Sequence, residues 1–123
     1  MAKKIMVVDD EPDVLAVAVF RFKKLGYEVF TATNGQEALD LLQGVLPDVM
    51  LLDLRLPQIN GIDVCKKVKH DERLKHIPVI LFTASTDNIA ENVLEAGADD
   101  FLIKPFEPED LLNKVRNLVG QPV

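Results

Sequence analysis

Short apolar runs alternate along the chain with segments that repeat apolar residues at helical spacing. Three runs are almost entirely apolar and stop at a polar residue: 4–8 before Asp9, 49–52 before Asp53, and 79–82 before Thr83. Two further runs, at 27–32 and 101–103, also predict strands. Runs that are apolar on both faces are typical of a parallel sheet buried on both sides.

Five segments between and after these runs carry helix signals. In the first, 12–25, Pro12 suits the first helical turn and Gly26 suits the position after the end. Asn34 and Glu37 predict a capping box for the second helix, which Gly44 should close. The remaining helices are expected at 61–69, 87–96 and 108–119.

This alternation of five strands with five helices predicts an α/β fold. The expected architecture is a doubly wound α/β sandwich around a five-stranded parallel sheet. No repeat, low-complexity tract or linker composition interrupts the pattern. We therefore expect residues 1–123 to form one domain.

Composition excludes several classes of function. The 20 acidic and 14 basic residues give a net charge of −6, which argues against direct nucleic-acid binding. No apolar run approaches the roughly 18 residues that span a bilayer, and residues 1–4 are too short for a signal peptide. We expect a cytoplasmic protein with no membrane contact. The single cysteine, Cys65, is expected to be a small buried hydrophobe.

Polar residues follow four of the predicted strands. Ligands of open parallel sheets bind at the carboxyl ends of the strands, where Asp9-Asp10-Glu11, Asp53, Thr83 and Lys104 should meet. Clustered carboxylates repel each other unless a cation intervenes, and a hard divalent cation such as Mg²⁺ suits oxygen ligands. Aspartate can also act as a nucleophile that forms an aspartyl phosphate. Lysine and threonine side chains could then stabilise the phosphoryl oxygens.

Most of these residues, taken alone, have an ordinary structural explanation; Asp53 has none, because residues 54–57 (LRLP) do not start a helix. Asp9 or Asp10 could cap a helix, and Thr83 could be a simple β-branched strand residue. Lys104 could be a solvated surface lysine, and Phe101 could be part of the core. Their joint placement at one edge of the sheet favours the functional interpretation.

Four motifs, in order and each at a strand end, resemble the response-regulator receiver family over essentially the whole chain. The motifs are 7–11 (VVDDE), 51–57 (LLDLRLP) with Gly61, 82–84 (FTA) and 97–106 (GADDFLIKPF). The resemblance implies a (βα)5 flavodoxin-like sandwich with strand order 2-1-3-4-5, in which Asp53 accepts a phosphoryl group. It also implies that Asp10, Asp53 and the backbone carbonyl of Arg55 bind Mg²⁺ (or Mn²⁺) directly, while Asp9 acts through water.

The resemblance also implies a switch. Thr83 is expected to sense the phosphoryl group, and Phe101 is expected to turn inward when Thr83 moves. Phe101 stands where tyrosine is frequent, so the inward turn would rest on burial alone. Lys104 should contact the phosphoryl group and form a cis bond to Pro105. Arg55 and Ser85, which flank the site, are expected to set how fast water attacks the acyl phosphate.

The expected phosphodonor is a sensor histidine kinase or a histidine phosphotransfer protein. Val14, Val17 and Arg21 form a stripe beside the core face of the first helix, and in this family that helix docks on the donor. Charged residues resemble part of a dimer face found in one branch of the family: Asp99, Asp100, Asp110, Lys114 and Arg116. The fourth helix lacks the matching basic residues, so we expect a monomer or a weak phosphorylation-dependent dimer whose output partner is unknown.

Three other functions compete with a phosphorylated switch. A phosphohydrolase of the haloacid dehalogenase type needs a second aspartate two residues after the nucleophile, where Arg55 stands. A flavodoxin-like electron carrier needs a phosphate-binding loop after the first strand, where Asp9-Asp10-Glu11 would repel phosphate. A degenerate receiver used as a scaffold is disfavoured by the intact Asp10, Asp53, Thr83 and Lys104. We therefore expect a switch and not a turnover enzyme.

Overall fold

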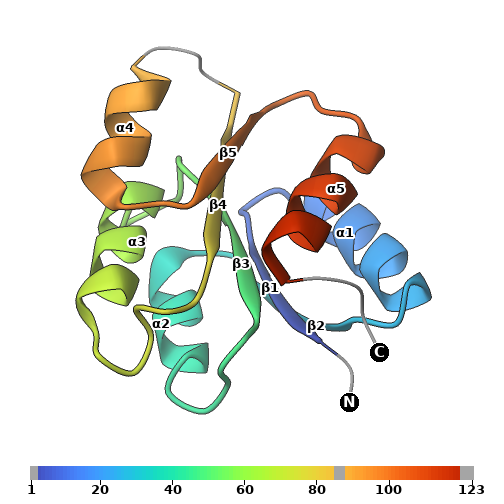
Figure 1. The fold of residues 1–123 in the computed structure, drawn as a ribbon, viewed down its shortest axis with the longest axis horizontal. Helices are drawn as coiled ribbons and strands as arrows, with labels where there is room; N and C mark the ends of the chain where they lie inside the picture. Colours follow the sequence, from blue (N-terminus) through green and yellow to red (C-terminus); the bar gives the residue numbers. More distant parts are fainter. Residues whose placement is uncertain (1–2, 85–87, 120–123) are drawn as a thin grey trace.

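Strands and helices alternate along the chain in the computed structural model, which describes residues 3–84 and 88–119 (Figure 1). The strands are β1 (Lys4–Val8), β2 (Glu28–Ala32), β3 (Val49–Asp53), β4 (Val79–Thr83) and β5 (Asp100–Ile103). The helices are α1 (Pro12–Lys24), α2 (Gly35–Leu41), α3 (Gly61–His70), α4 (Ile89–Ala96) and α5 (Pro108–Val119). The predicted boundaries agree with these to within two residues for most elements.

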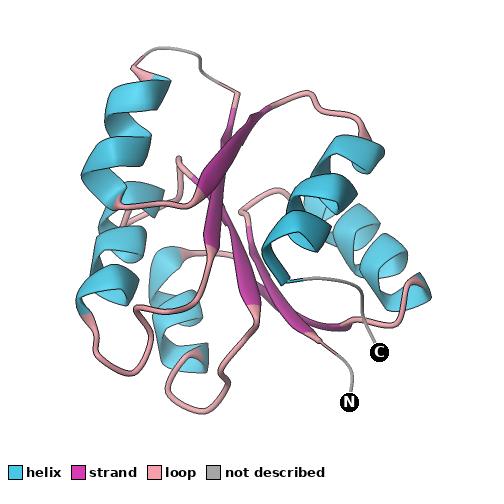
Figure 2. Ribbon diagram, viewed as in Figure 1, coloured by secondary structure: helices cyan, strands magenta, loops and turns pink. Residues whose placement is uncertain are grey.

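The strands form one parallel sheet in the order β2-β1-β3-β4-β5, so the predicted fold class and strand order are confirmed. Helices α1 and α5 cover one face of the sheet, and α2, α3 and α4 cover the other (Figures 1 and 2). No helix in the described part of the chain is both long enough and apolar enough to cross a membrane.

The core has two halves, one on each face of the sheet. In β3, Met50 and Leu52 belong to the half under α2, α3 and α4, while Val49 and Leu51 belong to the half under α1 and α5. All four side chains are at most 1% exposed, which explains why this strand is apolar without alternation. Cys65 lies in the first half as expected, and burial raises the pKa of its thiol to about 11.

The alternation of side chains also assigns the polar strand ends to faces. Successive side chains of a strand point to opposite faces of the sheet. Asp9, Asp53 and Lys104 each follow, two residues later, a buried residue that packs under α1 and α5, so they point to the same side. In β4 and β5, Thr83 and Phe101 follow the face of Leu81, which packs under α3 and α4. At this edge, the charged side chains therefore lie on one face of the sheet, and the Thr83 hydroxyl and the Phe101 ring lie on the other face.

Two predicted helix ends differ in detail from the structure. The Asn34 side chain accepts a hydrogen bond from the Glu37 N–H at 2.8 Å, but the Glu37 carboxylate accepts from the Thr33 N–H at 3.2 Å, one residue earlier than a capping box requires. The predicted closing role of Gly44 is wrong. Helix α2 ends at Leu41, and the Gly44 N–H donates to the Leu41 carbonyl in a tight turn without a left-handed residue.

Helix α1 ends as the sequence predicted. Gly26 has φ 95°, as the end of α1 requires. Asp87, the predicted start of the fourth helix, lies outside the described residues.

Gly61, at the start of α3, lies against the end of β3. A Cβ atom added there would lie 2.1 Å from the Asp53 carbonyl oxygen and 2.8 Å from the Leu54 Cα, both of them backbone atoms that cannot rotate away. We predict that Gly61→Ala lowers the free energy of unfolding by about 2–3 kcal/mol, measured by urea denaturation.

Gly44 provides the matched control, because an added Cβ there meets no atom within 4 Å. We expect Gly44→Ala to stay within about 0.5 kcal/mol of the parent protein. Equal stability of the two variants would contradict the proposed close approach of α3 to β3.

Candidate functional site

Two buried aspartates at the carboxyl edge of the sheet have the same local geometry. Asp9 and Asp53 are 0% and 5% exposed. The Oδ1 atom of each accepts a hydrogen bond from the backbone N–H two residues later, at 2.8 Å from Glu11 and 3.0 Å from Arg55. The Oδ2 atom of each accepts from Lys104 Nζ, at 2.9 Å for Asp9 and 3.1 Å for Asp53. Each loop therefore orients its own carboxylate toward one shared ammonium.

Lys104 is held from several directions. Its backbone N–H donates to the Thr83 carbonyl at 2.7 Å, which ties the end of β5 to the end of β4, and its peptide bond to Pro105 is cis. Its Nζ atom lies 5.0 Å from the centre of the buried Phe82 ring. The ammonium also donates to Glu11 Oε1 at 3.2 Å, so three carboxylates surround it. The sequence did not predict this contact of Glu11.

The shared ammonium and the burial have opposite effects on Asp53. Burial raises the pKa of the Asp53 carboxyl, the Arg55 N–H and Lys104 lower it, and the Asp9 charge raises it again, with a net increase above the ordinary value. For Lys104, burial lowers the pKa, but the hydrogen bonds and charges of Asp9 and Asp53 outweigh it, and the pKa is raised overall. The lysine therefore stays charged, while Asp53 would gain from further positive charge nearby.

The carboxylates lie close enough together to hold a metal ion. One oxygen atom from each of Asp9, Asp10, Glu11 and Asp53 lies within 4.8 Å of the others, and Asp10 and Glu11 are exposed. Hard divalent cations prefer such oxygen ligands, and Mg²⁺ needs only one or two carboxylates. The donor set fits Mg²⁺ or Mn²⁺.

Thr83 and Phe101 lie on the other side of the sheet edge from the carboxylates. Thr83 is fully buried at the end of β4. Phe101 is half-buried on β5 and packs against the core half under α3 and α4. The Arg55 side chain is exposed, and Ser85, the other residue expected to tune the site, lies outside the described residues.

The stripe predicted on α1 lies between two hollows. One hollow, of about 290 Å³, is lined by α1 and α5, and the other, of about 480 Å³, lies over the outer side of α1. Val17 and Arg21 line both, and Val17 is 54% exposed, whereas Val14 is half-buried and lines only the first. Phe20 is 55% exposed and carries Lys24 Nζ 5.1 Å above its ring. The Phe20 ring lies outside the predicted stripe of Val14, Val17 and Arg21.

Several charges of the suspected dimer face are engaged within the chain. Asp99 accepts from Lys69 Nζ at 2.8 Å and from the Val79 N–H at 2.8 Å. Lys114 Nζ contacts both oxygens of Asp100 at 3.0 Å. The sequence pattern did not predict these internal pairs, which reduce the charge left for a partner.

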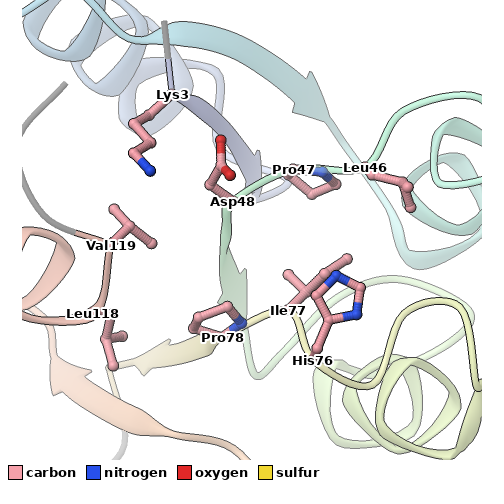
Figure 3. Close-up of a pocket in the computed structure, with 9 residues that line it drawn as sticks. All are labelled: Lys3, Leu46, Pro47, Asp48, His76, Ile77, Pro78, Leu118 and Val119. Atoms are coloured by element: carbon pink, nitrogen blue, oxygen red, sulfur yellow. The ribbon is translucent and has the colours of Figure 1, made fainter. Parts of the chain in front are cut away.

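A separate hollow of about 500 Å³ lies at the opposite edge of the sheet (Figure 3). It is lined by residues near the amino ends of β1, β3 and β4, including Lys3, Asp48 and His76, and by the end of α5. Asp48 Oδ2 already accepts from the Lys4 N–H at 2.7 Å. This hollow shares no residue with the carboxylate cluster.

Comparison with known proteins identifies the class. Residues 5–116 match the family described as the response regulator receiver domain. The chain is 36% identical over 120 residues to the alkaline phosphatase synthesis transcriptional regulatory protein PhoP of Bacillus subtilis, a match that covers 97% of this chain and 49% of that protein. It spans about half the length of the curated relatives that it matches, with 44%, 48% and 49% of three of them covered.

Solved structures of receiver domains and response regulators have the same fold as this chain. The receiver domain of the sensor histidine kinase PA1611 from Pseudomonas aeruginosa, which has a magnesium ion coordinated in its active site cleft, superposes with a TM-score of 0.89 at 29% identity over 98% of this chain and all of that one. The response regulator TrrA of Thermotoga maritima, in complex with Mg²⁺ and beryllofluoride, gives a TM-score of 0.84 at 32% identity over 94% and 98% of the two chains.

The fold, the family match and these relatives define the class of protein. The chain belongs to the response regulator receiver domain family, whose members are signalling switches of two-component systems.

The buried charge of Asp53 gives a prediction about stability and pH. A carboxyl whose pKa is higher in the folded state binds more protons when folded, so its contribution to stability falls as the pH rises through that pKa. We predict that Asp53→Asn, without divalent metal at pH 7.5, is more stable than the parent by about 1 kcal/mol.

The gain should shrink in acid, where Asp53 is itself protonated, as urea denaturation at several pH values would measure. An Asn variant that is less stable than the parent at pH 7.5 would show that the ion pair with Lys104 outweighs the cost of burial.

Proposed function

We propose that residues 1–123 act as a phosphoryl-accepting switch in which Asp53 takes a phosphoryl group from a phosphohistidine of a sensor kinase or phosphotransfer protein. One observation carries the proposal: a buried Asp53 carboxylate faces Lys104 Nζ at 3.1 Å, on the sheet edge that also collects Asp9, Asp10 and Glu11. The membership of the receiver family supports the same assignment.

The transfer needs few groups. A carboxylate oxygen of Asp53 attacks phosphorus, the P–N bond to the donor imidazole breaks, and the nitrogen leaves with the electron pair. We assign the attack to Oδ2, because Oδ1 is held by the Arg55 N–H and Oδ2 faces the ammonium. Lys104 balances the negative charge that arrives, and its raised pKa keeps it charged.

We assign Asp10, Asp53 and the Arg55 backbone carbonyl as direct ligands of Mg²⁺ or Mn²⁺, and Asp9 as a ligand through water. A bound divalent cation would supply positive charge to phosphoryl oxygens and offset repulsion among the carboxylates. The magnesium in the cleft of the Pseudomonas receiver domain supports this assignment. The exposure of Asp10 also supports it, because an exposed carboxylate can approach an ion without breaking a buried contact.

Phosphorylation would act outward through Thr83 and Phe101. The Thr83 hydroxyl, at the end of β4, would donate to a phosphoryl oxygen, and the half-buried Phe101 would bury itself further in the space that Thr83 leaves. The two packings of α4, β5 and α5 would then present different surfaces to an output partner. Asp99 pairs with Lys69, and Asp100 pairs with Lys114, within the chain. This internal pairing supports a monomer or a weak phosphorylation-dependent dimer.

The transfer can be tested by intact mass. We predict that the protein gains one phosphoryl group when it is incubated with a small-molecule phosphodonor and Mg²⁺, and that EDTA or Asp53→Asn abolishes the gain. Asp63→Asn, which removes an exposed carboxylate from α3, is the control and should be modified like the parent. Modification of the Asn variant, or none of the parent, would contradict the proposal.

A second test concerns the donor. Docking through α1 predicts that Val17→Asp slows transfer from a phosphorylated histidine phosphotransfer protein by about tenfold or more, because it puts a charge on the exposed stripe between the two hollows. Transfer from a small-molecule phosphodonor should be unchanged.

Leu94→Asp is the matched control, since Leu94 is an exposed leucine on α4 that lies outside both hollows of α1. Equal loss of protein-to-protein transfer in both variants, or no loss in the α1 variant, would exclude α1 as the docking surface.

A further inference from the structure

We propose that Glu11 is a positioning residue that competes with the incoming phosphoryl group for Lys104, an inference that rests on the proposed function of the site. Glu11 Oε1 lies 3.2 Å from Lys104 Nζ. The contact joins residues 93 positions apart, and it lies at the entrance of the site because the Glu11 side chain is 60% exposed.

The number of N–H donors on the Lys104 ammonium limits how many oxygens it can bind at once. A lysine ammonium has three N–H donors and no acceptor. Lys104 Nζ contacts one oxygen each of Asp9, Glu11 and Asp53, at 2.9, 3.2 and 3.1 Å. All three donors are therefore engaged, and Lys104 can donate to a phosphoryl oxygen only after one of these contacts lengthens or is shared.

The three contacts are not equally easy to give up. Asp9 is fully buried and would be left with an unpaired charge. Asp53 Oδ2 is the atom that we expect to attack phosphorus, so its contact with Lys104 is kept until the new bond forms. Glu11 makes the longest of the three contacts, and its exposed carboxylate would be solvated by water on release. The Glu11 contact is thus the one that yields.

The Glu11 side chain has no competing local task. Glu11 is the N-cap residue of α1, but its side chain makes no capping hydrogen bond; its backbone N–H donates to Asp9 Oδ1, and its carbonyl accepts from the Leu15 N–H. Its carboxylate is therefore available to hold Lys104. A role as a metal ligand is the main alternative, because one of its oxygens lies in the acidic cluster.

The test uses beryllofluoride, a phosphoryl analogue already seen with Mg²⁺ in the related Thermotoga protein. Its affinity for the whole protein is measured by ¹⁹F NMR titration at saturating Mg²⁺. We expect Glu11→Gln to bind beryllofluoride about two- to fivefold more tightly than the parent, which is the range that an exposed ion pair carries.

Asp13→Asn is the matched control. It removes the same charge two residues further along, from an exposed side chain that makes no contact with Lys104 among the described ion pairs. It should bind beryllofluoride like the parent. Equal tightening in both variants would mean that net charge alone is responsible, and would overturn the proposal.

Two further measurements separate the alternatives. A double-mutant cycle of Glu11→Gln and Lys104→Ala, measured by urea denaturation without metal, should give a favourable coupling between the two residues. Tighter beryllofluoride binding without such coupling would show direct repulsion of the analogue by Glu11, and would overturn the proposal. A loss of Mg²⁺ affinity above threefold in Glu11→Gln, measured by calorimetry, would show a metal ligand and would also overturn it.

The parent protein distinguishes the inference from the proposed function. If the parent binds beryllofluoride and Glu11→Gln binds it equally, only the role of Glu11 fails. If the parent does not bind beryllofluoride with Mg²⁺, the phosphoryl-accepting function fails, and the role of Glu11 fails with it.

Discussion

The site depends on the contacts of the Lys104 ammonium with two buried carboxylates. The ammonium lies between the buried carboxylates of Asp9 and Asp53, which come from positions 95 and 51 residues away. Two carboxylates removed from water would destabilise the fold unless a cation stood between them. The lysine, which follows β5, therefore forms ion pairs with carboxylates at the ends of β1 and β3. The hydrogen bonds of the sheet already fix the spacing of these strands.

The same arrangement leaves the site responsive. The Asp53 pKa is raised even beside Lys104, so the ammonium compensates the burial only in part. A divalent cation would supply the remaining charge, and a phosphoryl group would in turn compete for the ammonium. A site held by incomplete charge balance can therefore change its contacts in response to an added cation or anion, while the apolar core beneath it stays packed.

The buried parallel sheet could be predicted from the amino-acid sequence. The apolar runs in β1, β3 and β4 indicated a sheet buried on both faces, and the two halves of the core confirm it. Predictions that depended on finer geometry were less accurate. Gly44 resembled a helix end, yet α2 closes through backbone hydrogen bonds that need no left-handed residue. The capping pattern of Asn34 and Glu37 was half right, because the glutamate reaches the neighbouring Thr33 N–H.

The sequence by itself determined the strands, their parallel arrangement and the residue types at their polar ends, because these follow from local periodicity and from the rule that parallel strands present their carboxyl ends together. The strand order followed from the resemblance to the receiver family. Only the tertiary structure decided which of these side chains contact each other. The contact of Glu11 with Lys104 and the internal pairing of Asp99 with Lys69 each join segments that are distant in the sequence. Such contacts are fixed by strand register and helix orientation, which a one-dimensional pattern does not contain.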